Sequence, residues 1–97
     1  MLFERDTAKS RRTWKDRGFG FDYAARIFLG PTLEKQDDRK DYGEVRIQAI
    51  GQVNDNILFV VYTDPSSARH IISARLANRK ERKLWHSFAE HWKTSAD

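Results

Sequence analysis

The run Ile57-Leu58-Phe59-Val60-Val61-Tyr62 constrains the fold of this chain more than any other segment. Its β-branched and aromatic residues favour a strand, and it is far shorter than the ~20 residues that a membrane-spanning helix needs. Successive side chains of a strand point to opposite faces of the sheet, and here both sets are apolar. The run therefore predicts a central strand that is covered on both sides.

Two further strands are expected beside it. Val45–Val53 is predicted to be a strand with Val45, Ile47 and Ala49 on one face, and Arg69–Arg75 is predicted to be another. The polar stretches 54–56 and 64–67 read as turns, since Asn and Asp tolerate a positive φ. Together with Ile57–Thr63, these strands should form an antiparallel meander.

The remaining elements have weaker signals. The sequence predicts a short edge strand over 2–4 and then a helix that is capped by Asp6 and runs to Arg17, with Gly18 as its stop. A second helix, Tyr23–Leu29, is expected to be capped by Asp22. A strand near 32–36, a loop over 36–41 and a last helix from Asn78 follow. The resulting order, β-α-α-β-β-β-β-α, describes one α+β domain over residues 1–97. We expect a small twisted antiparallel sheet with helices packed on it.

The last helix carries the clearest helical pattern. Asn78 and Glu81 are spaced as a capping box, in which each side chain bonds the other residue's backbone N–H. An apolar stripe follows at helical spacing and should mostly pack on the sheet: Leu84, Trp85, Phe88, Ala89 and Trp92.

Charge points to an anionic partner. The net charge is +4, and the basic residues concentrate in segments 5–17 and 69–97 while the middle is acidic. Ends that meet in space would form a positive patch suited to RNA phosphates or to an acidic protein. The chain has no cysteine and shows no secretion signal, which favours the cytoplasm. It contains no Gly-rich phosphate loop, Ser-His-Asp set or zinc-ligand spacing, so we expect neither a cofactor nor a metal.

Several short motifs, in order, resemble those of the BrnT family of bacterial toxins. The matching residues are Phe3, Glu4, Asp6, Lys9, Gly18, Phe21, Ala24, Ala25, Phe28, Pro31, Asp38, Tyr42-Gly43-Glu44, Arg46, Ile50-Gly51, Val60–Thr63, Ile71–Arg75 and Glu81-Arg82. The chain departs from the family pattern at Arg5, Thr7, Thr13, Asp16, Arg17 and His70.

The resemblance implies a fold similar to the RelE and ParE toxins and metal-independent cleavage of RNA. It also implies a BrnA-like ribbon-helix-helix antitoxin as partner, with operator DNA bound only through the toxin–antitoxin complex. The alternative is a non-catalytic basic module that acts with its antitoxin in operator binding. A third possibility is a toxin with a different target, as gyrase is for ParE-type relatives.

Cleavage of RNA without a metal needs a base at the 2′-hydroxyl, an acid at the leaving oxygen and cations on the phosphorane. Arg46 and Arg75 are the first candidates for those cations, because a guanidinium can meet two phosphate oxygens at once. Glu44 is a candidate base, or alternatively an ion-pair partner of Arg46 or Arg75. His70 is a candidate acid or base, or alternatively a half-buried histidine in the sheet.

Four further residues are expected to contact RNA: Lys40, Arg79, Arg82 and Tyr62. Arg79 falls in the first turn of the last helix, where backbone N–H groups also attract phosphate. Tyr62 lies in the central strand, and its alternative is a core tyrosine with a hydrogen-bonded hydroxyl.

Overall fold

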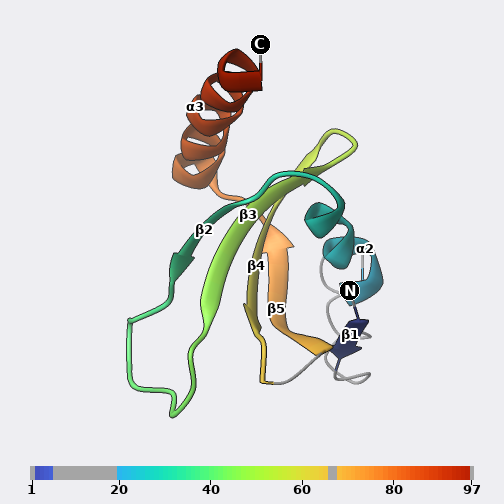
Figure 1. Ribbon diagram of the computed structural model, residues 1–97, viewed down its shortest axis with the longest axis vertical. Helices are drawn as coiled ribbons and strands as arrows, with labels where there is room; N and C mark the ends of the chain where they lie inside the picture. Colours follow the sequence, from blue (N-terminus) through green and yellow to red (C-terminus); the bar gives the residue numbers. More distant parts are fainter. Residues whose placement is uncertain (1, 6–19, 66–67, 97) are drawn as a thin grey trace.

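The computed structural model describes residues 2–5, 20–65 and 68–96. They form a five-stranded sheet in the order β1-β5-β4-β3-β2 (Figure 1). The strands are β1 (Leu2–Arg5), β2 (Leu33–Gln36), β3 (Ile47–Val53), β4 (Asn56–Thr63) and β5 (Ala68–Leu76), and the helices are α2 (Phe21–Ala24), the 3₁₀ helix η1 (Ala25–Leu29) and α3 (Arg79–Ala96). These elements confirm the α+β class and the antiparallel meander of β3, β4 and β5.

The expectation of a purely antiparallel sheet is wrong at one edge. Strand β1 pairs with β5 in parallel, with Leu2 opposite Ala68 and Arg5 opposite Ile71. A hairpin turn would force an antiparallel pair, but residues 6–67 separate β1 from β5, so no turn sets their relative direction.

Strand β4 is buried on both faces, as its sequence predicts. On one face, Leu58, Val60 and Tyr62 pack with residues of α2 and η1. On the other, Phe59 and Val61 belong to a second core with Trp85 of α3. The sheet therefore separates two hydrophobic layers, one under α2 and η1 and one under α3.

The second predicted helix has a different form. An α-helical turn over Phe21–Ala24 continues as the 3₁₀ helix η1, and Gly20 rather than Asp22 stands at the N-cap, where no side chain bonds the helix. The backbone here must lie close to β3: a methyl group at Gly51 would sit 2.6 Å from Cβ of Ile27. The tighter 3₁₀ turns bring Ile27 into this contact.

Helix α3 begins with the predicted capping box. The Glu81 N–H donates to Oδ1 of Asn78 at 2.8 Å, and the Asn78 N–H donates to Oε1 of Glu81 at 2.9 Å. Trp85 is buried and its indole donates to Gln52 on β3 at 3.0 Å. From this anchor α3 projects past the end of the sheet (Figure 1), and Leu84 is 50% exposed instead of packed.

Strand β5 contains a bulge. Val61 pairs with Ser73 and Tyr62 pairs with Ile71, so Ile72 is the extra residue. Ile71 and Ala74 consequently belong to the same core, although regular alternation would place them on opposite faces.

Two turn regions also differ from expectation. Asn54 has a φ of 55° and confirms the predicted turn, but Asn56 already belongs to β4. Strand β3 begins at Ile47, and Val45 is 58% exposed, so the loop after β2 is longer than predicted.

The helix predicted to end at Arg17 lies outside the described residues, as do the departures at 7, 13, 16 and 17. None of the helices in the described part of the chain is long and apolar enough to cross a membrane.

Candidate functional site

The side of the sheet that carries α3 gathers most of the predicted catalytic residues. We call it the α3 face. Strand alternation, the register and the two cores assign its residues: Leu33, Lys35, Asp37, Arg46, Gln48, Ile50, Gln52, Ile57, Phe59, Val61, Thr63, His70, Ile72, Ser73 and Arg75. Among the described residues of this face, the β4 side chains are buried, Lys35 and Gln52 are exposed, and Arg46, His70 and Arg75 are half-buried.

Arg46 and His70 lie in one row across this face. Thr63 of β4 pairs with His70 of β5. Continuing the β3–β4 pairing one residue beyond Ile47 and Tyr62 places Arg46 opposite Thr63, across β4 from His70. Two strand spacings, about 10 Å, therefore separate the backbones of Arg46 and His70. An arginine and a histidine can both reach a group that lies between them.

Arg46 is held by one weak ion pair and one aromatic ring. Its Nε donates to Glu44 at 3.2 Å, and its guanidinium carbon lies 4.1 Å from the centre of the Tyr42 ring. The Arg46 and Glu44 side chains are 27% and 41% exposed, so solvent weakens the pair. The bond to Glu44 does not use the two terminal nitrogens of Arg46.

A buried carboxylate organises the loop that precedes Arg46. Asp37 accepts from Nε and Nη2 of Arg39 at 2.8 and 2.7 Å, and from the Tyr42 hydroxyl at 3.4 Å. Its backbone N–H donates to the Arg46 carbonyl at 2.7 Å, which closes the loop. The Arg39 hydrogen bonds outweigh burial and lower the pKa of Asp37 to about 2. Sequence reasoning treated this segment as a plain polar loop, and the Asp37–Arg39 spacing was its only signal.

Arg75 is held more firmly than Arg46. Its Nη1 and Nη2 donate to the two Glu81 oxygens at 2.7 and 2.9 Å, and its guanidinium lies 4.2 Å from the centre of the Phe59 ring. Partial burial acts to raise the pKa of Glu81, but hydrogen bonds from Arg75 and the Asn78 backbone outweigh it, and the pKa is lowered. Glu81 thus links β5 to the first turn of α3.

The structure does not bring Arg46 and Arg75 together at one phosphate. Arg75 lies opposite Phe59, which lies opposite Ile50, four residues along β3 from Arg46. The two arginines are thus about 13 Å apart along the strands, in addition to two strand spacings. They share a face but contact different carboxylates, Glu44 and Glu81.

An apolar pocket of about 170 Å³ lies between these two arginines and the start of α3. Its lining is apolar at Leu33, Ile50, Phe59 and Leu84, and polar at Glu34, Lys35 and Gln48. Aromatic and aliphatic surface beside cations suits a nucleobase attached to a phosphate.

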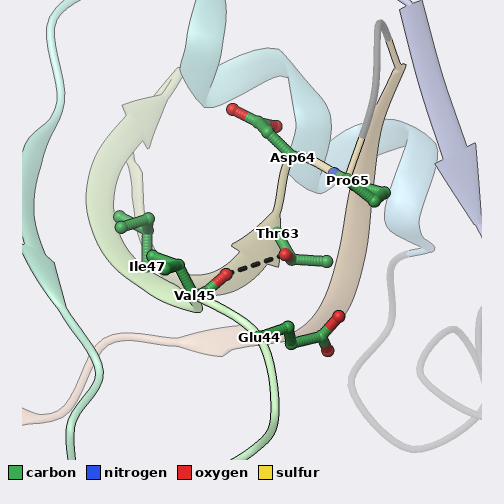
Figure 2. Close-up of a pocket in the computed structure, with 6 residues that line it drawn as sticks. All are labelled: Glu44, Val45, Ile47, Thr63, Asp64 and Pro65. Atoms are coloured by element: carbon green, nitrogen blue, oxygen red, sulfur yellow. Dashed lines mark hydrogen bonds between the residues drawn. The ribbon is translucent and has the colours of Figure 1, made fainter.

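A larger pocket of about 400 Å³ lies at the other end of the sheet, beside Glu44 (Figure 2). Two carboxylates line it, from Glu44 and Asp64, and the Thr63 hydroxyl donates to the Val45 carbonyl at 2.7 Å within it. The negative lining disfavours a phosphate inside this pocket, so a phosphate near Glu44 is expected outside the pocket, at Arg46.

Tyr62 cannot serve as the RNA contact that the sequence suggested. It is buried on the α2 side, and its hydroxyl donates to Glu34. Burial and the bond to Glu34 raise its pKa. The structure matches the alternative, a core tyrosine with a bonded hydroxyl.

Arg69 is a partner of Tyr62 that sequence reasoning did not single out. It bonds Asp64 through Nε and Nη2, both at 2.9 Å, and its guanidinium lies 3.9 Å from the centre of the Tyr62 ring and 4.6 Å from that of Phe28. These contacts make it a structural arginine of the α2 side. Bonding to Asp64 raises the pKa of the Arg69 guanidinium.

The other predicted RNA contacts lie at the margins of the α3 face. Arg79 and Arg82 are exposed in the first turn of α3, where Arg82 also donates to the Ala77 carbonyl at 2.8 Å. Lys40 is exposed on the loop, with its ammonium 5.1 Å from the centre of the Tyr42 ring. Among the described residues, His, Asp and Glu side chains form no group of three or more that could hold a metal ion.

The fold and the site define a small α+β domain whose sheet gathers arginines, a histidine and aromatic rings on one face. The family model of the ribonuclease toxin BrnT of type II toxin–antitoxin systems matches residues 6–81. The chain therefore belongs to the BrnT family of ribonuclease toxins. A search of curated proteins finds no match.

Proposed function

We propose that this protein is a metal-independent endoribonuclease that cleaves RNA bound along the α3 face, on a scaffold of the RelE type. The observation that carries the proposal is the row of Arg46, Thr63 and His70, which offers a cation and a proton-transfer group about 10 Å apart on one face. Family membership supplies the reaction class.

The reaction follows from that row. The 2′-oxygen attacks the adjacent phosphorus, the bond to the 5′-oxygen breaks, and the products are a 2′,3′-cyclic phosphate and a 5′-hydroxyl. Arg46 stabilises the phosphorane through its terminal nitrogens. Glu44 and His70 carry out the two proton transfers. One of them takes the proton from the 2′-hydroxyl, and the other gives a proton to the leaving 5′-oxygen.

The remaining cations hold the rest of the RNA backbone. Arg75 lies too far from Arg46 to contact the same phosphate, so we assign it to a neighbouring one. Lys40, Arg79 and Arg82 are exposed and extend the positive surface at both ends of the face.

In the cell, we infer that the toxin acts on cytoplasmic RNA, inhibits translation and is neutralised by a BrnA-like ribbon-helix-helix antitoxin. Family membership and the basic α3 face support this partnership, because a protein that covers the face would exclude RNA. Operator DNA would then be bound through the antitoxin.

The test is cleavage of a mixed RNA in EDTA by the wild-type protein and by variants. Arg46→Ala and His70→Ala should each lower the rate by roughly a hundredfold or more. Arg26→Ala is the matched control, since Arg26 is an exposed arginine of η1 that stacks on Tyr23 at 5.6 Å. Its rate should equal that of the wild type.

A second function, the non-catalytic module, is favoured by the carboxylates that pair both arginines. Tight RNA retention without cleavage in the same assay would support that module and exclude the enzyme. Cleavage that needs an added divalent metal would contradict the proposed mechanism.

A further inference from the structure

The loop over 37–46 contains a cation–aromatic stack whose ring, Tyr42, has no role in the reaction above. The Tyr42 ring has the Arg46 guanidinium 4.1 Å from its centre and the Lys40 ammonium 5.1 Å from it. Unstacked RNA bases bind to tyrosine rings and guanidinium planes in this way, and cations beside them bind the flanking phosphates.

We propose that Tyr42, with Arg46 and Lys40, is a subsite for one nucleotide of single-stranded RNA. The base stacks on the Tyr42–Arg46 pair, and its phosphate lies against Lys40 and the terminal nitrogens of Arg46. This inference rests on the proposed function, because Arg46 would hold the scissile phosphate while Tyr42 selects the nucleotide beside it.

Among the described arginines that pair with a carboxylate, Arg46 has the guanidinium most available for further hydrogen bonds. Within the described residues, Arg39, Arg69 and Arg75 each donate two hydrogen bonds to one carboxylate. Arg46 donates one, through Nε at 3.2 Å, to a carboxylate that is itself 41% exposed. A phosphate can therefore replace or join Glu44 at Arg46 at little cost.

The loop is also built to hold its shape without a ligand. Asp37, whose side chain is 1% exposed, fixes Arg39 and the Tyr42 hydroxyl, and the Asp37 backbone bonds that of Arg46. Gly43 has a φ of 73°, and its N–H donates to Asp41 at 2.9 Å, which makes the turn toward β3. A platform that is ordered beforehand loses little entropy on binding. Asp37 is accordingly a positioning residue.

Binding can be measured apart from cleavage with a single-stranded RNA oligonucleotide that carries 2′-O-methyl groups, because the nucleophile is then blocked. In EDTA, with fluorescence anisotropy, Tyr42→Ala should weaken binding by roughly tenfold, the loss of one stacked base. Tyr42→Phe keeps the ring and should bind within about twofold of the wild type. Arg26→Ala should bind as the wild type does.

A crosslink locates the contact independently. An oligonucleotide with 5-iodouridine, irradiated in complex with the wild-type protein, should attach to Tyr42. In Asp37→Asn the affinity for RNA should fall several-fold, with KM for cleavable RNA rising while kcat changes little.

Two results would overturn the subsite. One is unchanged affinity in a folded Tyr42→Ala protein, and the other is an equal loss in Tyr42→Phe and Tyr42→Ala. If Tyr42→Ala fails to fold, Lys40→Ala is tested in its place. Unchanged RNA affinity and an unchanged crosslink in Lys40→Ala would also overturn the subsite. Loss of binding to a partner protein with RNA affinity intact would assign the loop to that partner. If the RNA binds through stacking on Tyr42 but ordinary RNA is not cleaved, the subsite is confirmed and the proposed ribonuclease activity is rejected.

Discussion

Ile71 and Ala74 lie three residues apart on β5, yet both pack into the core under α2 and η1. The bulge at Ile72 makes this possible. It also places His70 and Arg75, five residues apart, on the same α3 face, which regular alternation would prevent. Bulges that re-aim side chains in this way often lie beside functional sites.

The bulge makes a prediction for two adjacent positions. Ala74→Glu should lower the free energy of unfolding by about 3 kcal/mol or more, because it buries an unpaired charge. Ser73→Glu should change it by less than about 0.5 kcal/mol, since Ser73 is exposed. Urea denaturation measures both, and a reversed order of the two effects would contradict the register of β5.

The close approach of η1 to β3 predicts the effect of a single methyl group. Gly51→Ala should destabilise the protein by about 1–3 kcal/mol, because the new Cβ meets Ile27 Cβ at 2.6 Å. Gly30→Ala is the matched control, since a Cβ there has no atom within 4 Å. Thermal unfolding of the two variants should differ clearly, and equal melting temperatures would argue against this packing.

The buried carboxylate of the loop predicts a stability change in acid. The pKa of Asp37 is about 2 in the folded protein against an ordinary value of 3.8. Its contribution to stability is therefore complete above pH 3.8 and is lost as the pH falls toward 2. Asp37→Asn should remove about 1–2 kcal/mol near neutral pH and flatten the profile of unfolding free energy between these values. An unchanged profile would mean that Asp37 is not charged in its pairing with Arg39.

The link between β5 and α3 predicts an effect of Glu81. Glu81→Gln breaks the ion pair with Arg75 and weakens the capping box, and should cost about 1–2 kcal/mol of unfolding free energy. The exposed Lys83→Gln change in the same helix should cost less than about 0.5 kcal/mol. Because the folded pKa of Glu81 is lowered, the difference between Glu81→Gln and the wild type should shrink as the medium becomes acidic. Denaturation at neutral and acidic pH measures it.

The sequence predicted those parts of the fold that rest on local patterns. The apolar run of β4 placed it at the centre, Asn54 placed a turn, and Asn78 with Glu81 placed the start of α3. The parallel pairing of β1 with β5 could not be predicted, because pairing between distant segments produces no periodic pattern in the amino-acid sequence.

The candidate site was predicted only as residue types. Arg46, Arg75 and His70 were identified by chemistry and by family resemblance, but their common face depends on the bulge, and a bulge has no signature in Ile71–Arg75. Asp37 was missed because a buried carboxylate and an exposed one look alike in a polar stretch. Tyr62 was chosen for its chemistry, whereas its depth in the core follows from the packing of α2 and η1 on the sheet.

The parallel pairing of β1 with β5 has a consequence for biosynthesis. Strand β1 is synthesised before its partner, which begins at Ala68, so this edge of the sheet can close only after β5 has been made. His70 belongs to that late partner. If His70 takes part in cleavage as proposed, a chain that has not yet been synthesised through β5 lacks one of the groups that the reaction needs.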